Sequence, residues 1–186
     1  MLGTALFLFG NTQVQAQFPE DFESGVPPAG WTNTEGNLFD GGVSGYGTGS
    51  SSTEFDFYDI SSGTLTLTSP TFTPTTAGMS LSFDVAGAAY PGATDEIDLQ
   101  ESTDGGTTWT TVQVMTNAVG DVLNTYGGAI TGGFSPSAAQ WATLNYTLDA
   151  GTDAIQFLGT TGYGNNVFID NVDLLAAPTD CNGAPN

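Results

Sequence analysis

The segment EIDLQESTDGGTTWTTVQVM, residues 96–115, sets the fold class of this chain. Apolar and polar side chains alternate in its first part (96–101) and in its last part (109–115), which is the period of a half-buried β-strand. The residues between the two parts include adjacent glycines and several polar side chains, which favour a tight turn. We therefore predict an antiparallel β-hairpin.

The turn of this hairpin matches the Asp-box pattern, Ser-x-Asp-x-Gly-x-x-Trp, through Ser102, Asp104, Gly106 and Trp109. Sialidases and other β-proteins carry this pattern. The Asp104 carboxylate can accept backbone N–H groups, and Gly106 tolerates a positive φ angle. Trp109 is predicted to return to the core. We interpret the motif as structural, because a sialidase binds its substrate carboxylate with arginines and this chain has none.

The same alternation recurs along the rest of the chain. The further predicted strands cover residues 64–68, 79–85, 141–148, 154–158 and 167–175. No long segment shows helical periodicity, and long surface loops are predicted at 41–52 and 117–133. Seven or more short strands separated by turns predict an all-β, antiparallel sandwich.

The charge pattern excludes many kinds of chemistry. The 186 residues include no Lys, Arg or His but 20 Asp and Glu, which gives a formal net charge of −20. An imidazole base, a lysine nucleophile and a histidine metal ligand are therefore excluded. Nucleic acids and anionic membrane surfaces are excluded as partners, because both are bound through Lys and Arg. The remaining oxygens suit Ca²⁺ and sugar hydroxyls, although the acidity can also serve solubility alone.

The chain divides into three segments. Residues 1–16 are predicted to be a signal peptide, because a short apolar run precedes a cleavage pattern ending at Ala16; the alternative is a buried N-terminal strand. The run is too short to span a bilayer, so no membrane insertion is expected. Residues 17–176 can form one sandwich domain. Residues 177–186, with Cys181, are predicted to be a linker or the start of a following Cys-containing repeat; the alternative is a frayed terminus.

Several segments occur in a distinctive order. They are FPEDFESG (18–25), PPAGW (27–31), LTSP (67–70), the Asp-box turn, Phe134 with Trp141, and GNNVFIDNV (164–172). Together they resemble the MAM-like, choice-of-anchor J (cleaved adhesin) domains of secreted Bacteroidota proteins. The resemblance implies a jelly-roll β-sandwich, export by a type IX route, and service as an adhesion or ligand-binding module beside other domains. The total lack of basic residues is a departure from the family.

Asp170 is the sharpest candidate for a metal ligand. Alternation places it on the same strand face as Phe168 and Val172. A lone carboxylate is costly among apolar neighbours, so Asp170 needs backbone N–H donors or a bound metal. The family resemblance implies a structural Ca²⁺ that links Glu23 to Asp170, with carbonyl oxygens near Asp40 completing the shell. The alternative is a hydrogen-bonded structural aspartate.

Two further acidic clusters are open to several interpretations. Asp95, Glu96 and Asp98 could form a second ion site or half of a two-carboxylate glycosidase. We favour a solvated edge strand, whose charges discourage pairing between molecules. The acidic residues within 54–59 are predicted to form an exposed strand end.

Four tyrosines lie near glycines in predicted loops, where rings can stack on sugar C–H faces while amides and carboxylates bind the hydroxyls. They are Tyr46, Tyr90, Tyr126 and Tyr163. The alternative is that these tyrosines anchor loops. The tryptophans Trp31, Trp109 and Trp141 are predicted to fill the core.

Three classes of function remain. The leading one is a non-catalytic extracellular accessory module, stabilised by calcium, that binds a glycan or a protein ligand within a larger secreted or surface protein. The second is a two-carboxylate polysaccharide hydrolase, which the absence of His and Lys does not forbid. The third is a passive acidic spacer or filament subunit.

Overall fold

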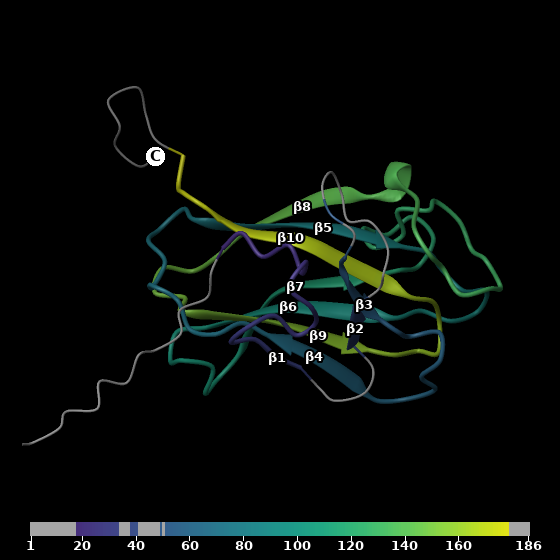
Figure 1. Ribbon diagram of the computed structural model, residues 1–186, viewed down its shortest axis with the longest axis horizontal. Coiled ribbons are helices and arrows are strands. Elements are labelled where there is room, and N and C mark those ends of the chain that lie inside the picture. Colours follow the sequence, from purple (N-terminus) through teal and green to yellow (C-terminus); the bar gives the residue numbers. More distant parts are fainter. Residues whose placement is uncertain (1–17, 34–37, 41–48, 50, 179–186) are drawn as a thin grey trace, which may run out of the picture.

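The computed structural model describes residues 18–33, 38–40, 49 and 51–178, which form two five-stranded antiparallel sheets (Figure 1). The first sheet has the order β1 (Thr32–Asn33), β4 (Thr64–Thr68), β9 (Ala154–Thr160), β6 (Glu96–Ser102) and β7 (Thr110–Thr116). The second has the order β2 (Leu38–Asp40), β3 (Thr53–Phe55), β10 (Val167–Leu175), β5 (Ser80–Gly87) and β8 (Ala142–Thr147). A short 3-10 helix, η1 (Ala138–Gln140), precedes β8.

The connections give the sandwich its topology. From β3 onward, consecutive strands alternate between the two sheets, except that β6 and β7 form the predicted hairpin. The resulting orders, β3-β10-β5-β8 and β4-β9-β6-β7, are those of a jelly roll. The predicted antiparallel jelly-roll β-sandwich is therefore confirmed.

The core lies between the sheets because alternate side chains of each strand point inward. In β4, for example, Leu65 and Leu67 are buried whereas Thr64 is exposed. Phe83 of β5 meets Phe157 of β9 across the interface, with ring centroids 5.0 Å apart and planes at 74°. Full burial of one such ring contributes about 1.5–3 kcal/mol to stability.

Strand bounds agree with the alternation pattern where strands are long. β4 and β10 have the predicted bounds, and the other five predicted strands differ by no more than a few residues. Strands β1 and β2 were not predicted, and β3 was anticipated only as a strand end within 54–59, since two or three residues cannot show alternation. The interpretation of residues 95–98 as the start of an edge strand is wrong, because β6 lies between β9 and β7.

Some predictions fall outside the described residues. They concern the signal peptide (1–16), Tyr46 and Cys181, and with them the domain bounds at 17–176 and the linker at 177–186 stay predictions. Within the described residues, no helix has both the length and the apolar character needed to cross a membrane.

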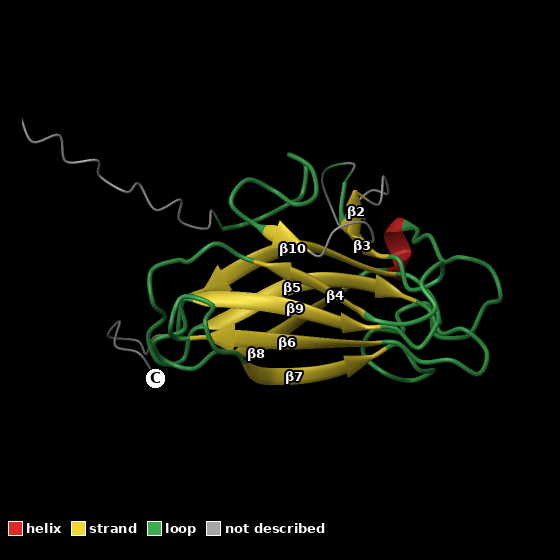
Figure 2. Ribbon diagram, turned by 90° about the horizontal axis from the view of Figure 1, so that it is seen from below, coloured by secondary structure: helices red, strands yellow, loops and turns green. Residues whose placement is uncertain are grey.

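The connections gather at the two ends of the sandwich (Figure 2). One end, called the loop end, carries the β3–β4, β5–β6, β7–β8 and β9–β10 connections, and the other carries the β6–β7 turn. The opening segment lies beside β10, because the N–H of Glu20 donates to the carbonyl of Val172 (2.8 Å) and the N–H of Val172 donates back to Glu20 (2.9 Å).

Candidate functional site

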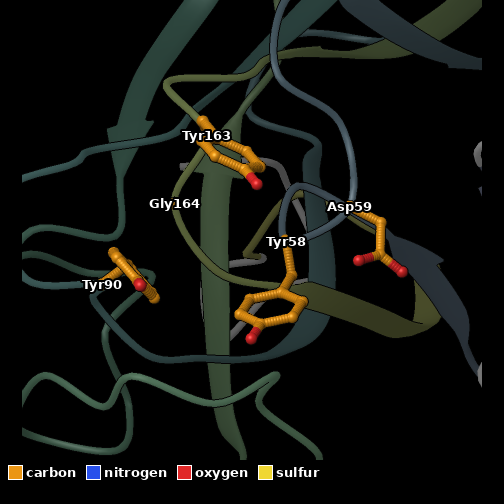
Figure 3. A pocket seen from close by; sticks show the side chains of 5 residues that line it. All are labelled: Tyr58, Asp59, Tyr90, Tyr163 and Gly164. Carbon is orange, nitrogen blue, oxygen red and sulfur yellow. The ribbon is translucent and has the colours of Figure 1, made fainter.

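A pocket of about 290 Å³ opens at the loop end, and three connections supply its walls (Figure 3). Tyr58 and Asp59 come from the β3–β4 connection, Tyr90 from β5–β6, and Tyr163 and Gly164 from β9–β10. Figure 3 shows the three rings and the Asp59 carboxylate arranged around a common space. We call this group of five residues the tyrosine pocket.

Tyr58 and Tyr90 form one side of the tyrosine pocket. Their ring centroids are 6.2 Å apart and their planes are inclined at 59°. The Tyr58 hydroxyl donates to the carbonyl of Thr131 (3.4 Å), and the Tyr58 N–H donates to Oδ1 of Asn166 (3.0 Å). The Tyr58 ring is therefore held by neighbouring connections.

Tyr163 is the most exposed ring of the tyrosine pocket, with 56% of its surface accessible. It has a φ of 60°, which is unusual for a residue other than glycine, and it stands between Gly162 and Gly164. A Cβ at Gly164 would overlap the Asp95 carboxylate, and one at Gly162 would overlap the carbonyl of Thr94. Both flanking positions therefore require glycine.

Asp95 holds the Tyr163 loop in place. Its side chain is fully buried. Oδ1 accepts hydrogen bonds from the N–H groups of Gly162 (2.9 Å) and Gly164 (3.0 Å). Oδ2 accepts from the N–H of Asn165 and from Nδ2 of Asn117, both at 2.7 Å. The prediction of a solvated position for this cluster is wrong for Asp95, which joins three connections of the loop end.

Acidic side chains flank the tyrosine pocket on the Asp59 side. The pKa of Glu54 is raised to about 7, mainly by burial and also by the charges of Asp56 and Asp59. Glu54 accepts a hydrogen bond from Nδ2 of Asn166 (2.5 Å), the residue that also binds the Tyr58 N–H. The predicted exposed strand end is therefore wrong for Glu54 and Asp56, which are half-buried, whereas Asp59 is exposed but lies in the turn that follows β3.

The structure separates the four tyrosines that were predicted to bind sugars. Tyr90 and Tyr163 share the pocket. Tyr126 is not part of its lining; it is 44% exposed and packs edge-on against Phe134, with centroids 6.0 Å apart. Tyr46 lies outside the described residues. Tyr58 was not predicted, because it follows a phenylalanine-rich stretch without the adjacent glycines that drew attention to the others.

Asp170 lies in a second acidic region, on β10. It is 1% exposed and stands opposite Asp84 of β5 in the strand register. Within the described residues, its carboxylate accepts one hydrogen bond, from the N–H of Asn171 (2.7 Å). The pKa of Asp170 is raised to about 7, mainly by burial and also by the charges of Asp84, Asp21 and Glu23. We call Asp21, Glu23, Asp84 and Asp170 the carboxylate junction.

Glu23 reaches the carboxylate junction from the opening segment, and its Oε1 accepts a hydrogen bond from the N–H of Ser51 (2.7 Å). The backbone of Asp40, in β2, pairs with Thr53 of β3. The side chain of Asp40 lies outside what the structure describes. Among the described residues, no three acidic or cysteine side chains are grouped closely enough to hold a metal by themselves. A Ca²⁺ here would therefore need oxygens from the backbone or from hydroxyl groups as well.

The Asp-box turn forms at the end opposite the tyrosine pocket. Oδ1 of Asp104 accepts hydrogen bonds from the N–H of Thr108 (2.8 Å) and from the hydroxyl of Ser102 (2.8 Å). Hydrogen bonds from Thr108 are the main reason why the pKa of Asp104 is lowered. Gly106 has a φ of 82°. The prediction for Trp109 is wrong, because the ring is half-buried against Gly106 instead of entering the core.

Solved structures share this fold at low sequence identity. The K1 cleaved adhesin domain of Lys-gingipain from Porphyromonas gingivalis matches with a TM-score of 0.62 and 18% identity, covering 86% of this chain and 97% of that domain. The K2 domain of Lys-gingipain gives 0.61 and 18%, covering 86% and 98%. The carbohydrate-binding module TmCBM61, solved with β-1,4-galactotriose, gives 0.51 and 17%, covering 87% and 98%.

These matches include domains of the kind that the sequence resembles, and at such identities they show a shared fold. No protein-family model matches the chain, and no curated protein sequence matches it.

Proposed function

We propose that this chain is a non-catalytic extracellular module that binds a glycan in the tyrosine pocket. The observation that carries the proposal is the convergence of three tyrosine rings and one carboxylate from three separate connections. Aromatic faces stack on sugar C–H groups, while phenol and carboxylate oxygens bind hydroxyl groups. The pocket volume lies at the small end of the range for ligand sites.

Preorganisation of the walls supports the proposal. Tyr58 is held through its hydroxyl and its N–H, and the Tyr163 loop is held by the buried Asp95. A ligand that enters such a pocket orders few side chains, so little of its binding energy is lost to entropy.

The hydrolase alternative has less support. A glycosidase needs two carboxylates on either side of the scissile bond. Among the described residues, Asp59 is the acidic side chain in the pocket lining, and nearby Glu54 is bound to Asn166. The domain is therefore proposed to bind its ligand without cleaving it.

We also propose that the domain is secreted or displayed at a bacterial surface as part of a longer protein. The supporting observations are the export-like sequence at 1–16 and the fold shared with a cleaved adhesin domain and with a carbohydrate-binding module. The competing roles are binding of a protein ligand and service as a passive spacer. The glycan array described next separates glycan binding from both of these roles.

The test is a glycan array with the wild-type domain and two single variants. Tyr163→Ala removes an exposed ring from the pocket, and Tyr126→Ala removes an exposed ring outside the pocket lining. We expect Tyr163→Ala to weaken binding by on the order of tenfold, as for loss of a stacked aromatic ring, and Tyr126→Ala to leave it unchanged. Absence of glycan binding, or equal losses in both variants, would contradict the proposal.

A structural Ca²⁺ at the carboxylate junction is a separate proposal. Glu23 and Asp170 would supply carboxylate oxygens, and the bound ion would neutralise charge there. The support is that Asp170 is buried beside other carboxylates and that the chain contains no cationic side chain.

A further inference from the structure

The tyrosine pocket is rich in acceptors and negative charge. Its side chains present three phenol groups and one carboxylate. Within the described residues, the Asp59 carboxylate accepts no hydrogen bond, so its oxygens remain available to a ligand. The Tyr58 hydroxyl uses its hydrogen on the carbonyl of Thr131, which leaves its lone pairs free.

Charges around the tyrosine pocket have one sign. Asp56 and Asp59 act on each other and on Glu54 across the β3–β4 connection. No cationic side chain exists anywhere in the chain to offset them. An anionic ligand would meet unopposed repulsion, whereas a cationic one would be attracted to the pocket from a distance.

Aromatic rings extend this preference to the pocket walls. The face of a tyrosine ring carries the negative end of its quadrupole, and a cation within about 6 Å of the ring is attracted to it. The inclined rings of Tyr58 and Tyr90, with Tyr163 and the Asp59 carboxylate around the same space, suit an ammonium group. A neutral sugar would gain the stacking but not the electrostatic attraction.

We propose that the tyrosine pocket selects glycans with free, protonated amino sugars over their neutral N-acetylated counterparts. This inference rests on the proposed function, because it specifies the glycan for the same site. A sugar that carries an ammonium group offers both a C–H face for the rings and a positive charge for Asp59. The expected preference is on the order of tenfold in affinity, which is the size of one desolvated cation–π contact.

The test is calorimetry of the full chain with the β-1,4-linked tetramer of glucosamine and with its fully N-acetylated counterpart. We expect tighter binding of the free-amine tetramer. Asp59→Asn should weaken this binding severalfold more than it weakens binding of the N-acetylated tetramer, because an amide oxygen can still accept from a sugar hydroxyl but carries no charge. Tyr163→Ala should weaken binding of both tetramers.

A matched control separates the pocket from general attraction to an acidic protein. Asp173→Asn removes the same charge from β10, on the portion of the strand remote from the loop end, and we expect it to leave both affinities unchanged. Equal weakening by Asp173→Asn and Asp59→Asn would overturn the inference, because it would indicate unspecific charge attraction.

Two other outcomes distinguish this inference from the proposed function. If the N-acetylated tetramer binds at least as tightly and depends on Tyr163, the amine preference fails while glycan binding stands. If neither tetramer depends on Tyr163 and the glycan array is also negative, both fail. Equally tight, Asp59-dependent binding of tetralysine would overturn the assignment to an amino sugar.

Discussion

Asp95 and Asp170 are both buried carboxylates in a chain without cationic side chains, yet they are satisfied in different ways. Asp95 accepts four hydrogen bonds from N–H groups, three of them in one glycine-rich loop. From the residues that the structure describes, Asp170 accepts one hydrogen bond, and the charges of other acids act on it. Loop N–H groups can turn toward a carboxylate, whereas those of a sheet are used by neighbouring strands. Of the two carboxylates, Asp170 is therefore the one at which a bound proton or an external cation should stabilise the fold more.

Removal of Asp95 should give the largest loss of stability. Asp95→Ala leaves several buried N–H groups without an acceptor, so we expect the free energy of unfolding to fall by about 3–5 kcal/mol. Urea unfolding at neutral pH measures the change. Asp95→Asn keeps the shape and should lose less, and Asp173→Asn, which removes a half-buried carboxylate of β10, serves as the control. A loss below about 1 kcal/mol for Asp95→Ala would show that the Tyr163 loop keeps its conformation without this carboxylate.

Calcium should have the next largest effect, and it should act through Asp170. At a hundredfold excess over its dissociation constant, a bound ion stabilises by about 2.7 kcal/mol, which corresponds to a rise in Tm of roughly 5–10 °C for a domain of this size. Thermal melts with chelator and with CaCl₂ measure the shift. Asp170→Asn should abolish it.

The same variant gives an effect of opposite sign without metal. In chelator at pH 8, Asp170→Asn should raise Tm, because it removes a carboxylate whose pKa is raised by burial and by neighbouring acids. Asp95→Asn should lower Tm under the same conditions. Identical behaviour of the two variants would remove the distinction between the two sites.

Glu54 should contribute to the pH dependence of stability together with Asp170, because burial raises the pKa of both groups. The pKa of Glu54 is raised from 4.5 to about 7, so the folded state keeps a proton that the unfolded chain releases between these values. Its contribution is complete below about pH 4.5 and is lost as the pH rises through about 7. We expect about 1 kcal/mol, after allowance for partial exposure.

Melting curves at pH 5 and pH 8 in chelator test this sign. Tm should be higher at pH 5, and Glu54→Gln should reduce the difference, leaving the part that Asp170 contributes in the same range. A pH dependence that is unchanged in Glu54→Gln would mean that Glu54 does not hold its proton in the folded state.

Asp104 should have the smallest effect and the opposite pH sign. Its pKa is lowered by hydrogen bonds from Thr108 and Ser102 in an exposed turn, so its contribution is present above about pH 4 and is lost as the pH falls further. Melts between pH 2 and pH 5 should show a weaker pH dependence in Asp104→Asn than in the wild type. A stronger dependence in the variant would contradict this assignment.

Sequence patterns predicted the sandwich because long strands repeat the alternation that the core requires. β4 and β10 were predicted with their observed bounds, and Asp170 was recognised as a carboxylate in need of a partner. The Asp-box turn was predicted from residues within one short segment, and its hydrogen bonds are local. Hydrogen bonds between residues only a few positions apart can therefore be inferred from the sequence alone.

Interactions between distant segments could not be inferred in the same way. The donors of Asp95 lie mostly at 162–165, far along the chain, and nothing in the pattern around residues 95–98 indicates them. Similarly, Tyr90 and Tyr163 share a pocket while Tyr126 does not, which depends on how the connections fold over the sheet ends. Tyr58 lacks the adjacent glycines that singled out the other tyrosines, and its place depends on the Asn166 side chain from another connection.

The loop that presents Tyr163 is bound to Asp95 through main-chain N–H groups. The phenol side chain is thus absent from these contacts, so the residues that fix the backbone differ from the ring that we propose to bind the ligand. If the proposed binding role holds, exchange of that one ring, for example for asparagine, which also tolerates the left-handed backbone, would change the ligand preference and leave the architecture intact. Under that proposal, the ligand preference could diverge among proteins of this fold by single substitutions at this position.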